Sequence, residues 1–364
     1  MIKIIIRRTA SATLLGVGLL LASGAMAATV YTETNSIQGN EVQIYETGAD
    51  GVLALAGQVS TGGLGTSAGL GNQGALALTM DRRWLFAVNA GSNEISSFAV
   101  GPTGLSLVAR VASGGTGPVS VTAHENLLYV LNAGGTGEIT GFTIQADGHL
   151  VPIAHSGRPL SSNAAGAAQI AFDRDGERLV VTEKATNKIS VYAVDDDGRA
   201  AGPSVHPSNG PTPFGFAFDR RNDLLVSEAF GGHANAAALS SYDLNDDSAA
   251  LQLISGSVPA NQTAACWVVL AGHYAYVTNT GSGTITGYRV SRAGELTRLS
   301  ADGRTGVTGG GPTDAAASRD GNTLYVLSPS IGKIVTFHVN SDGTVTPLAS
   351  TPGAPATATG LIAR

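Results

Sequence analysis

Two glutamates at the ends of similar apolar runs are the residues of this chain best suited to acid–base chemistry. Glu183 ends the run LVVTE and Glu228 ends the run LLVSE. A carboxylate whose pKa is raised by burial or by a neighbouring charge can act as a general base. We therefore expect Glu228 to be the leading catalytic group and Glu183 an auxiliary one. The alternative is structural, because each glutamate can instead accept hydrogen bonds from a neighbouring loop or pair with Lys184 or Lys188.

Two loop histidines and two arginines are candidates to assist these carboxylates. His206 precedes a glycine- and proline-rich loop, and His233 lies in an extended loop after Glu228. We expect either histidine to act as an auxiliary catalytic group. Arg158 and Arg304 stand where an outer strand gives way to a loop, and a guanidinium there can hold a carboxylate or phosphate with two hydrogen bonds. The alternative for all four is a solvated surface position.

Other candidate ligand contacts stand where small-residue strands begin, which is where the chain comes nearest to the centre of the predicted fold. They are Gln73, Gln169 and Asp314, with Phe214 as a flat apolar contact that core packing also explains. The chain has no His/Cys metal-ligand spacing, no phosphate-binding loop and no nucleophile elbow. We therefore predict neither a metal nor a cofactor.

All these positions belong to a unit that recurs along the chain. Hairpin-like runs such as 85–100, 128–144 and 275–290 recur at intervals of about fifty residues, without a helical period. Seven copies can be aligned, and the first strand of each ends, in order, on Asn35, Asn89, Asn132, Glu183, Glu228, Asn279 and Ser328. A period of this length made of short strands is typical of propellers. The sequence predicts an all-β fold, a seven-bladed β-propeller of four-stranded antiparallel blades.

The direction of the strands predicts where a ligand binds. The innermost strand and the next one are antiparallel, so the loop that enters the first and the end of the second open on one face. We expect a central funnel there that holds a small-molecule ligand. The chain begins its repeats near Val30 without an innermost strand, and residues 355–364 resemble an innermost strand without a partner. Pairing of these two ends would close the ring and leave no open edge.

The first 27 residues are expected to lie outside the fold. Lys3, Arg7 and Arg8 precede an apolar stretch at 12–22, and a small-residue cleavage site ends at Ala27. This pattern predicts a cleaved signal peptide, with an uncleaved anchor as the alternative. We therefore expect a periplasmic or extracellular protein in which residues 28–364 form a single domain without a membrane span.

Composition limits the partners and the redox chemistry. The formal net charge is −6 and charged residues make up 13% of the chain, which argues against nucleic acid or an anionic membrane as partner. Cys266 is the only cysteine and lies in the apolar run AACWVVL, so we expect it to be buried and unreactive. We expect the protein to be a monomer.

The repeats resemble those of the lactonase-type seven-bladed propellers, which include 6-phosphogluconolactonase-like and carboxymuconate-cyclase-like proteins. The resemblance is carried by Tyr129–Asn132, Tyr276–Asn279, the Gly-Pro pairs at 117–118, 210–211 and 311–312, and Glu228. It implies lactone chemistry in the funnel. In this family a Gly-Pro-Arg-His segment opens the innermost strand, whereas this chain has Gly210-Pro211-Thr212-Pro213-Phe214 and lacks both the arginine and the histidine.

Two functional hypotheses follow. The first is hydrolysis or isomerisation of a small lactone or cyclic acid. Its residues are Glu228 as base, Glu183 with His206 or His233 as auxiliaries, and Arg158 or Arg304 as the substrate clamp. The second is a non-catalytic propeller that binds a sugar, a peptide or a cell-envelope partner. A redox propeller is a third option, but the sequence has no haem-type CxxCH motif and no other cofactor anchor.

Overall fold

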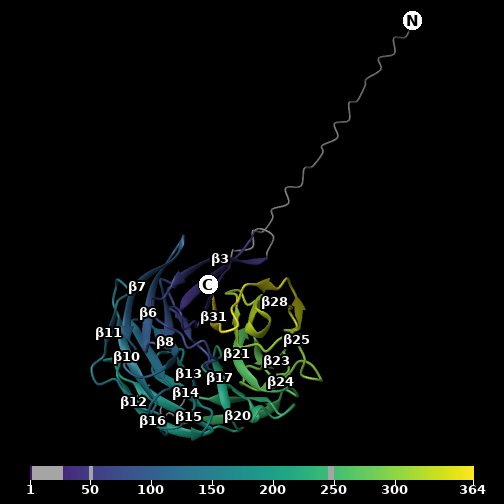
Figure 1. Ribbon diagram of the computed structural model, residues 1–364. Helices are drawn as coiled ribbons and strands as arrows, with labels where there is room; N and C mark the ends of the chain where they lie inside the picture. The colour runs from purple at the N-terminus through teal and green to yellow at the C-terminus, as the bar shows by residue number, and fades with distance from the viewer. Residues whose placement is uncertain (2–27, 49–51, 245–249) are drawn as a thin grey trace.

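Seven antiparallel sheets are arranged around a common axis in the computed structural model, which describes residues 1, 28–48, 52–244 and 250–364 (Figure 1). The predicted seven-bladed propeller is confirmed. The predicted signal peptide lies, apart from Met1, outside the described residues. Within the described part of the chain, no helix has the length and apolar character needed to cross a membrane.

The blades are numbered in chain order, and their strands are given from the axis outwards. Blade 1 contains β31 (Thr359–Ala363), β1 (Thr29–Glu33), β2 (Glu41–Thr47) and β3 (Leu53–Ser60). Blade 2 contains β4 (Leu76–Leu78), β5 (Trp84–Asn89), β6 (Glu94–Gly101) and β7 (Gly104–Ala112). Blade 3 contains β8 (Pro118–His124), β9 (Leu127–Asn132), β10 (Glu138–Ile144), β11 (Leu150–Pro152) and β12 (Arg158–Pro159). Blade 4 contains β13 (Ala167–Phe172), β14 (Arg178–Glu183), β15 (Lys188–Val194) and β16 (Ala200–Pro207).

The remaining three blades follow the same plan. Blade 5 contains β17 (Pro213–Phe218), β18 (Leu224–Glu228), β19 (Ala238–Asp243) and β20 (Gln252–Pro259). Blade 6 contains β21 (Ala265–Ala271), β22 (Tyr274–Asn279), β23 (Thr284–Val290), β24 (Leu296–Arg298) and β25 (Gly306–Val307). Blade 7 contains β26 (Asp314–Ala317), β27 (Thr323–Ser328), β28 (Lys333–Val339), β29 (Val345–Pro347) and β30 (Thr351–Pro352). Two short 3-10 helices, η1 (Phe230–Gly232) and η2 (Pro329–Ile331), follow the second strands of blades 5 and 7.

The hydrophobic core lies between successive blades. In β14 the side chains of Leu179, Val180 and Val181 are all fully buried, because they alternate between two faces that are each covered by a neighbouring blade. Leu179 and Val181 pack with Tyr129 and Leu131 of blade 3. Around the axis, each innermost strand contacts the innermost strand of the next blade, from β31 through β4, β8, β13, β17, β21 and β26 back to β31. Each blade is therefore fixed by both of its neighbours.

The two ends of the chain close the ring, as the sequence predicted. β31 pairs antiparallel with β1, so that Val30 lies opposite Ala363 and Thr32 opposite Leu361. In Figure 1 the C-terminus lies beside the N-terminal blade. The closing strand brings the last residues of the chain to the axis, where β31 contacts β26 and β4.

One position of the predicted repeat was wrong. Glu183 lies opposite Ala167 and Glu228 opposite Pro213, each near the start of its innermost strand. In blade 1 the equivalent residue, which lies opposite Thr359, is Glu33 and not Asn35. Asn35 has a positive φ of 50° and belongs to the longer turn that follows β1, and this extra turn length displaced the alignment by two residues.

Candidate functional site

Glu228 is fully buried and lies in a network of hydrogen-bond donors. The backbone N–H of Gly210 donates to Oε1 at 2.8 Å, and the hydroxyl of Ser240 donates to the same oxygen at 2.6 Å. The hydroxyl of Ser257 donates to Oε2 at 2.6 Å. The carboxylate thus joins the loop that enters β17 to the third and fourth strands of blade 5. These contacts match the structural alternative considered for this residue.

Glu183 is held in the same way in blade 4 and is also fully buried. Ser161 donates through its backbone N–H to Oε1 at 3.0 Å and through its hydroxyl to Oε2. Thr186 and Ser190 donate their hydroxyl hydrogens at 2.8 and 2.7 Å. Lys184, a candidate ion-pair partner, instead donates its ammonium hydrogen to the carbonyl oxygen of Gly71.

Blade 1 adds a third glutamate that the sequence alignment missed. Glu33 is fully buried, and among the described residues its carboxylate accepts a side-chain hydrogen bond only from Asn40, at 3.4 Å to Oε2. Burial raises the pKa of Glu33 well above its usual range, and the bond from Asn40 opposes this shift. Glu33, Glu183 and Glu228 therefore belong to one buried polar layer and share the same position in their blades.

Gln169 and Asp314 lie near the axis, as predicted, and link neighbouring innermost strands. The Gln169 amide donates to the carbonyl oxygen of Phe216 at 3.1 Å and accepts from its N–H at 2.7 Å. Asp314 accepts a hydrogen bond from the N–H of Leu361 at 3.0 Å. Burial raises the pKa of Asp314 to about 8. The polar atoms of both side chains thus form hydrogen bonds that join neighbouring blades.

The segment 71–73, which precedes β4 of blade 2, reaches across the axis to blade 6, and we call it the axial segment. The Gln73 amide donates to the carbonyl oxygen of Val268 at 2.9 Å and accepts from its N–H at 3.1 Å. The indole N–H of Trp267 donates to the carbonyl oxygen of Asn72 at 2.6 Å. Gln73 lies at the axis as predicted, but it is part of a connection between distant blades.

Aromatic and cationic side chains pack beneath this segment. The ring of Phe214 lies 5.1 Å from that of Trp267, and the Lys184 ammonium lies 4.8 Å from the centre of the Phe214 ring. Burial lowers the pKa of Lys184. Phe214 is only 8% exposed, in agreement with the core-packing explanation. On the face where the sequence predicted an open funnel, the axial segment and these side chains pack across the axis.

The remaining predicted residues lie towards the periphery. His206 is on the outermost strand β16, with Nε2 3.1 Å from the Ser204 hydroxyl, and His233 is exposed after η1. Arg158 is on β12 and donates to backbone carbonyl oxygens of its own loop, and Arg304 is exposed before β25. Among the described residues, none of these four is hydrogen bonded to, or ion-paired with, either predicted catalytic glutamate.

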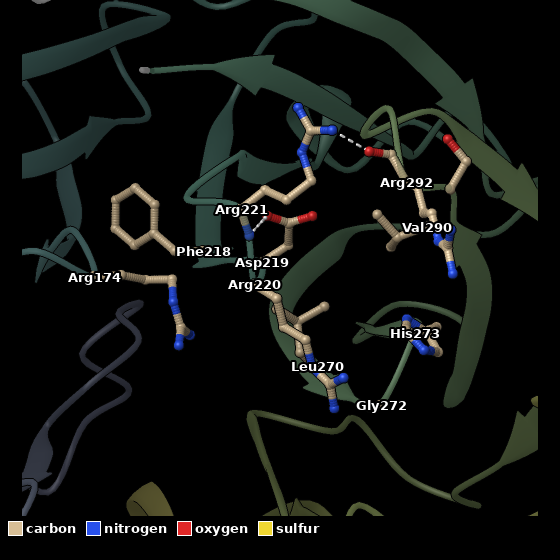
Figure 2. A pocket seen from close by; sticks show the side chains of 11 residues that line it. Arg174, Phe218, Asp219, Arg220, Arg221, Leu270, Gly272, His273, Val290 and Arg292 are labelled. Atoms are coloured by element: carbon tan, nitrogen blue, oxygen red, sulfur yellow. Dashed lines mark hydrogen bonds between the residues drawn. The ribbon is translucent and has the colours of Figure 1, made fainter.

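A pocket of about 360 Å³ opens on the opposite face of the propeller, at the turns between the first and second strands of blades 4, 5 and 6 and the turn between the third and fourth strands of blade 6 (Figure 2). It is lined by Arg174, Phe218, Asp219, Arg220, Arg221, Leu270, Gly272, His273, Val290, Ser291 and Arg292. Four arginines and one histidine dominate this lining, and we call it the basic pocket. None of the predicted site residues belongs to it.

The turns of blades 4 and 5 are joined side by side, which positions two of these arginines. The Asn222 amide donates to Asp173 at 3.2 Å and accepts from the N–H of Arg174 at 2.9 Å. Asn222 has a positive φ of 71°, a conformation that asparagine tolerates better than most residues. Arg174 and Arg220 are therefore carried by turns that are fixed relative to each other.

The charge in the basic pocket is only partly balanced. Arg221 donates to the carbonyl oxygen of Arg292 and lies 3.5 Å from the buried carboxylate of Asp223. In Figure 2 its side chain extends towards Arg292, whereas those of Arg174 and Arg220 extend away from it. Within the described part of the chain, the guanidiniums of Arg174, Arg220 and Arg292 have no hydrogen-bond or ion-pair partner. Unpaired guanidiniums around a concave site are suited to carboxylate or phosphate groups.

Comparison with known proteins identifies a family model and solved structures that resemble this propeller. Residues 154–269 match the family model described as "Lactonase, 7-bladed beta-propeller", and this range covers blades 4 and 5. The resemblance inferred from the repeats is thereby confirmed. No curated protein matches the chain.

Solved structures share the fold along nearly the whole chain. A putative 6-phosphogluconolactonase from Bacteroides fragilis superposes with a TM-score of 0.72 at 18% identity, covering 94% of this chain and 99% of that one. The periplasmic gluconolactonase PpgL of Pseudomonas aeruginosa superposes with a TM-score of 0.69 at 18% identity, covering 92% and 98%. At this level of identity the similarity concerns the fold and not the chemistry.

Proposed function

We propose that this protein binds a small organic anion in the basic pocket, and that the anionic group is the carboxylate of a sugar acid. The observation that carries the proposal is the set of unpaired guanidiniums of Arg174, Arg220 and Arg292 around a pocket of about 360 Å³. This volume lies within the usual range for small-molecule sites. A carboxylate bound there would replace water around cations that have no protein partner.

The rest of the lining favours a polyhydroxy acid over a simple fatty or aromatic acid. Phe218, Leu270 and Val290 give the pocket an apolar wall suited to the C–H face of a sugar ring. His273 and Ser291 add hydrogen-bonding groups suited to hydroxyl groups. The pocket therefore combines the three features that a sugar acid presents.

Calorimetric titration with gluconate and glucuronate tests the proposal, with glucose as the uncharged control. We expect both acids to bind and glucose to bind at least about tenfold more weakly, because a hydrogen bond to a charged group contributes about 1.5–3 kcal/mol. Arg220→Gln is expected to weaken acid binding about 10- to 100-fold. Lys333→Gln removes one positive charge at an exposed position on the opposite face, at the start of β28, and is the matched control. Equal affinities of the two variants would overturn the proposal.

Lactone hydrolysis is the second candidate function, favoured by the family match over residues 154–269. In this reaction a base takes a proton from water, the water oxygen attacks the acyl carbon, and the ring oxygen leaves as a hydroxyl. The product is a hydroxy acid, the class of anion proposed for the basic pocket. Glu228 is the base that the sequence favoured, with Glu183, His206 or His233 as auxiliaries, and His273 is the candidate base inside the pocket.

A lactone panel with the spontaneous rate subtracted separates these possibilities. Turnover lost in His273→Gln alone would locate the reaction in the basic pocket. Turnover lost in Glu228→Gln, with unchanged stability, would locate it at the buried polar layer. Sugar-acid binding without turnover in the wild type would leave binding as the function.

We also propose that the protein is exported, on the basis of the signal-like pattern in residues 1–27, and that it is a monomer. Expression followed by fractionation and N-terminal sequencing tests export, with Ala28 expected as the first residue of the mature chain. Light scattering of the purified protein tests the monomer.

A further inference from the structure

A second group of cations lies on the same face as the basic pocket, at blades 7, 1 and 2. Arg319 is in the turn between β26 and β27, Arg364 follows β31, and Arg82 is in the turn between β4 and β5. β31 packs against both β26 and β4, so these three residues stand at the ends of three consecutive innermost strands. We call Arg82, Arg319 and Arg364 the arginine triad.

The triad brings like charges together in a partly buried place. Burial and the positive charges of Arg319 and Arg364 lower the pKa of the Arg82 guanidinium. Within the described chain, the guanidiniums of Arg82 and Arg319 have no hydrogen-bond or ion-pair partner. Arg364 donates a long hydrogen bond, at 3.5 Å, to the carbonyl oxygen of Gly101, and it also interacts with the Tyr31 side chain, where it opposes the raising of the Tyr31 pKa by burial.

The acidic residues of the same turns are engaged in local hydrogen bonds. Asp81 accepts from the Thr79 hydroxyl at 2.6 Å, and Asp320 accepts from the Ser318 hydroxyl at 2.5 Å. Their carboxylates are therefore used to hold the turns together. The repulsion of Arg82 by its two cationic neighbours costs free energy, which a bound anion would offset.

We propose that the arginine triad is a second anion subsite, so that the ligand is an acidic oligosaccharide with one carboxylate in the basic pocket and another at the triad. The proposal for the first carboxylate rests on the proposed function. The class of ligand follows from the arrangement of the cations. They lie on one face of the propeller, in turns of blades 4, 5 and 6 and of blades 7, 1 and 2, rather than gathered at one point. A chain of uronic acids presents its charges in that spaced manner, whereas a single phosphate concentrates its charge.

Titration with oligogalacturonates of one to six sugars tests the second subsite. We expect affinity to rise by at least about tenfold at the length that first reaches both subsites, because the second contact then forms intramolecularly. Arg319 is exposed, and Arg319→Gln is expected to fold normally and to abolish this gain while leaving the affinity for the single sugar acid unchanged. Lys333→Gln, which removes an exposed positive charge at the start of β28 on the opposite face, is expected to change neither value.

The outcomes separate the two proposals. If the single sugar acid binds but longer chains bind no better, or if Arg319→Gln has no length-dependent effect, the second subsite is refuted and the basic pocket stands. If long chains bind in a manner sensitive to Arg319→Gln and insensitive to Arg220→Gln, the triad stands and the basic pocket is refuted. If no length binds at low ionic strength, both are refuted.

Discussion

Removal of the Glu228 side chain tests whether the buried polar layer is structural. In Glu228→Ala three donors lose their acceptor, namely the N–H of Gly210 and the hydroxyls of Ser240 and Ser257. A buried polar group without a partner costs about 1–3 kcal/mol, and the two hydroxyls can recover part of this cost by rotating. We expect the free energy of unfolding to fall by about 3–6 kcal/mol, a large fraction of the roughly 5–15 kcal/mol of a typical domain.

Glu228→Gln is the sharper variant, because it retains the shape of the side chain. The amide oxygen can replace Oε1 as acceptor for Gly210 and Ser240, and the amide nitrogen can donate to the Ser257 hydroxyl. Only the charge assistance is lost, so we expect a decrease of about 1–2 kcal/mol. The difference between the alanine and glutamine variants thus measures the unsatisfied donors.

Urea unfolding followed by tryptophan fluorescence is the assay, since Trp267 is only 5% exposed in the folded protein. Glu177→Gln is the matched control at an exposed position and should change stability by less than about 0.5 kcal/mol. A loss below about 1 kcal/mol in Glu228→Ala would refute the structural role. A fully stable Glu228→Gln protein that had lost lactone turnover would instead support the catalytic one.

Three further predictions concern closure, the cysteine and pH. Leu361 is only 7% exposed in the closing strand, so Leu361→Ala should lower the free energy of unfolding by about 2–5 kcal/mol. Thermal and urea denaturation measure this loss, and a change under about 0.5 kcal/mol would contradict the closure. Burial raises the pKa of the Cys266 thiol to about 11. Iodoacetamide at pH 8 should therefore alkylate the native protein at least about 100-fold more slowly than the urea-unfolded protein. Similar alkylation rates would contradict this burial. Burial and, secondarily, the charge of Asp219 raise the pKa of Asp223 from 3.8 to about 6. The unfolded chain therefore loses this proton at lower pH than the folded one, and wild type should lose stability relative to Asp223→Asn as pH rises from 3.8 to about 6. A difference in Tm that stayed constant with pH would contradict this assignment.

The fold could be predicted because its signals are local and repeated. The strands of each blade appear in the sequence as short apolar runs, such as Leu127–Asn132 and Tyr274–Asn279, and the spacing of these runs predicts the number of blades. Closure followed from a missing innermost strand at one end and an unpaired one at the other. The shift from Asn35 to Glu33 arose where a longer turn changed the local spacing without changing the pattern of residue types.

The role of the glutamates was harder to predict, because a change of residue type at a repeated position looked like a functional departure. The hydrogen-bond partners of these residues show why such a change can be purely structural. The Asn89 amide donates to the Ser96 hydroxyl at 2.8 Å, whereas the Glu228 carboxylate accepts from the Ser240 hydroxyl at 2.6 Å. A hydroxyl can donate or accept, so the same bond is made in both blades with its direction reversed.

The arginines of the opposite face were missed for a different reason. Arg174 and Arg319 stand in turns of the type Arg-Asp-Gly, which are normally solvated, and nothing in the local pattern separates them from ordinary turns. Their proximity to other cations depends on the closed ring, which places Arg364 between the turns of blades 7 and 2. Closure and charge are therefore coupled, because the strand that completes blade 1 also delivers one of the three guanidiniums of the triad. A variant that weakens the pairing of β31 with β1 should then lose affinity for long acidic chains before it loses affinity for a single sugar acid, since only the second subsite depends on the position of the last residue.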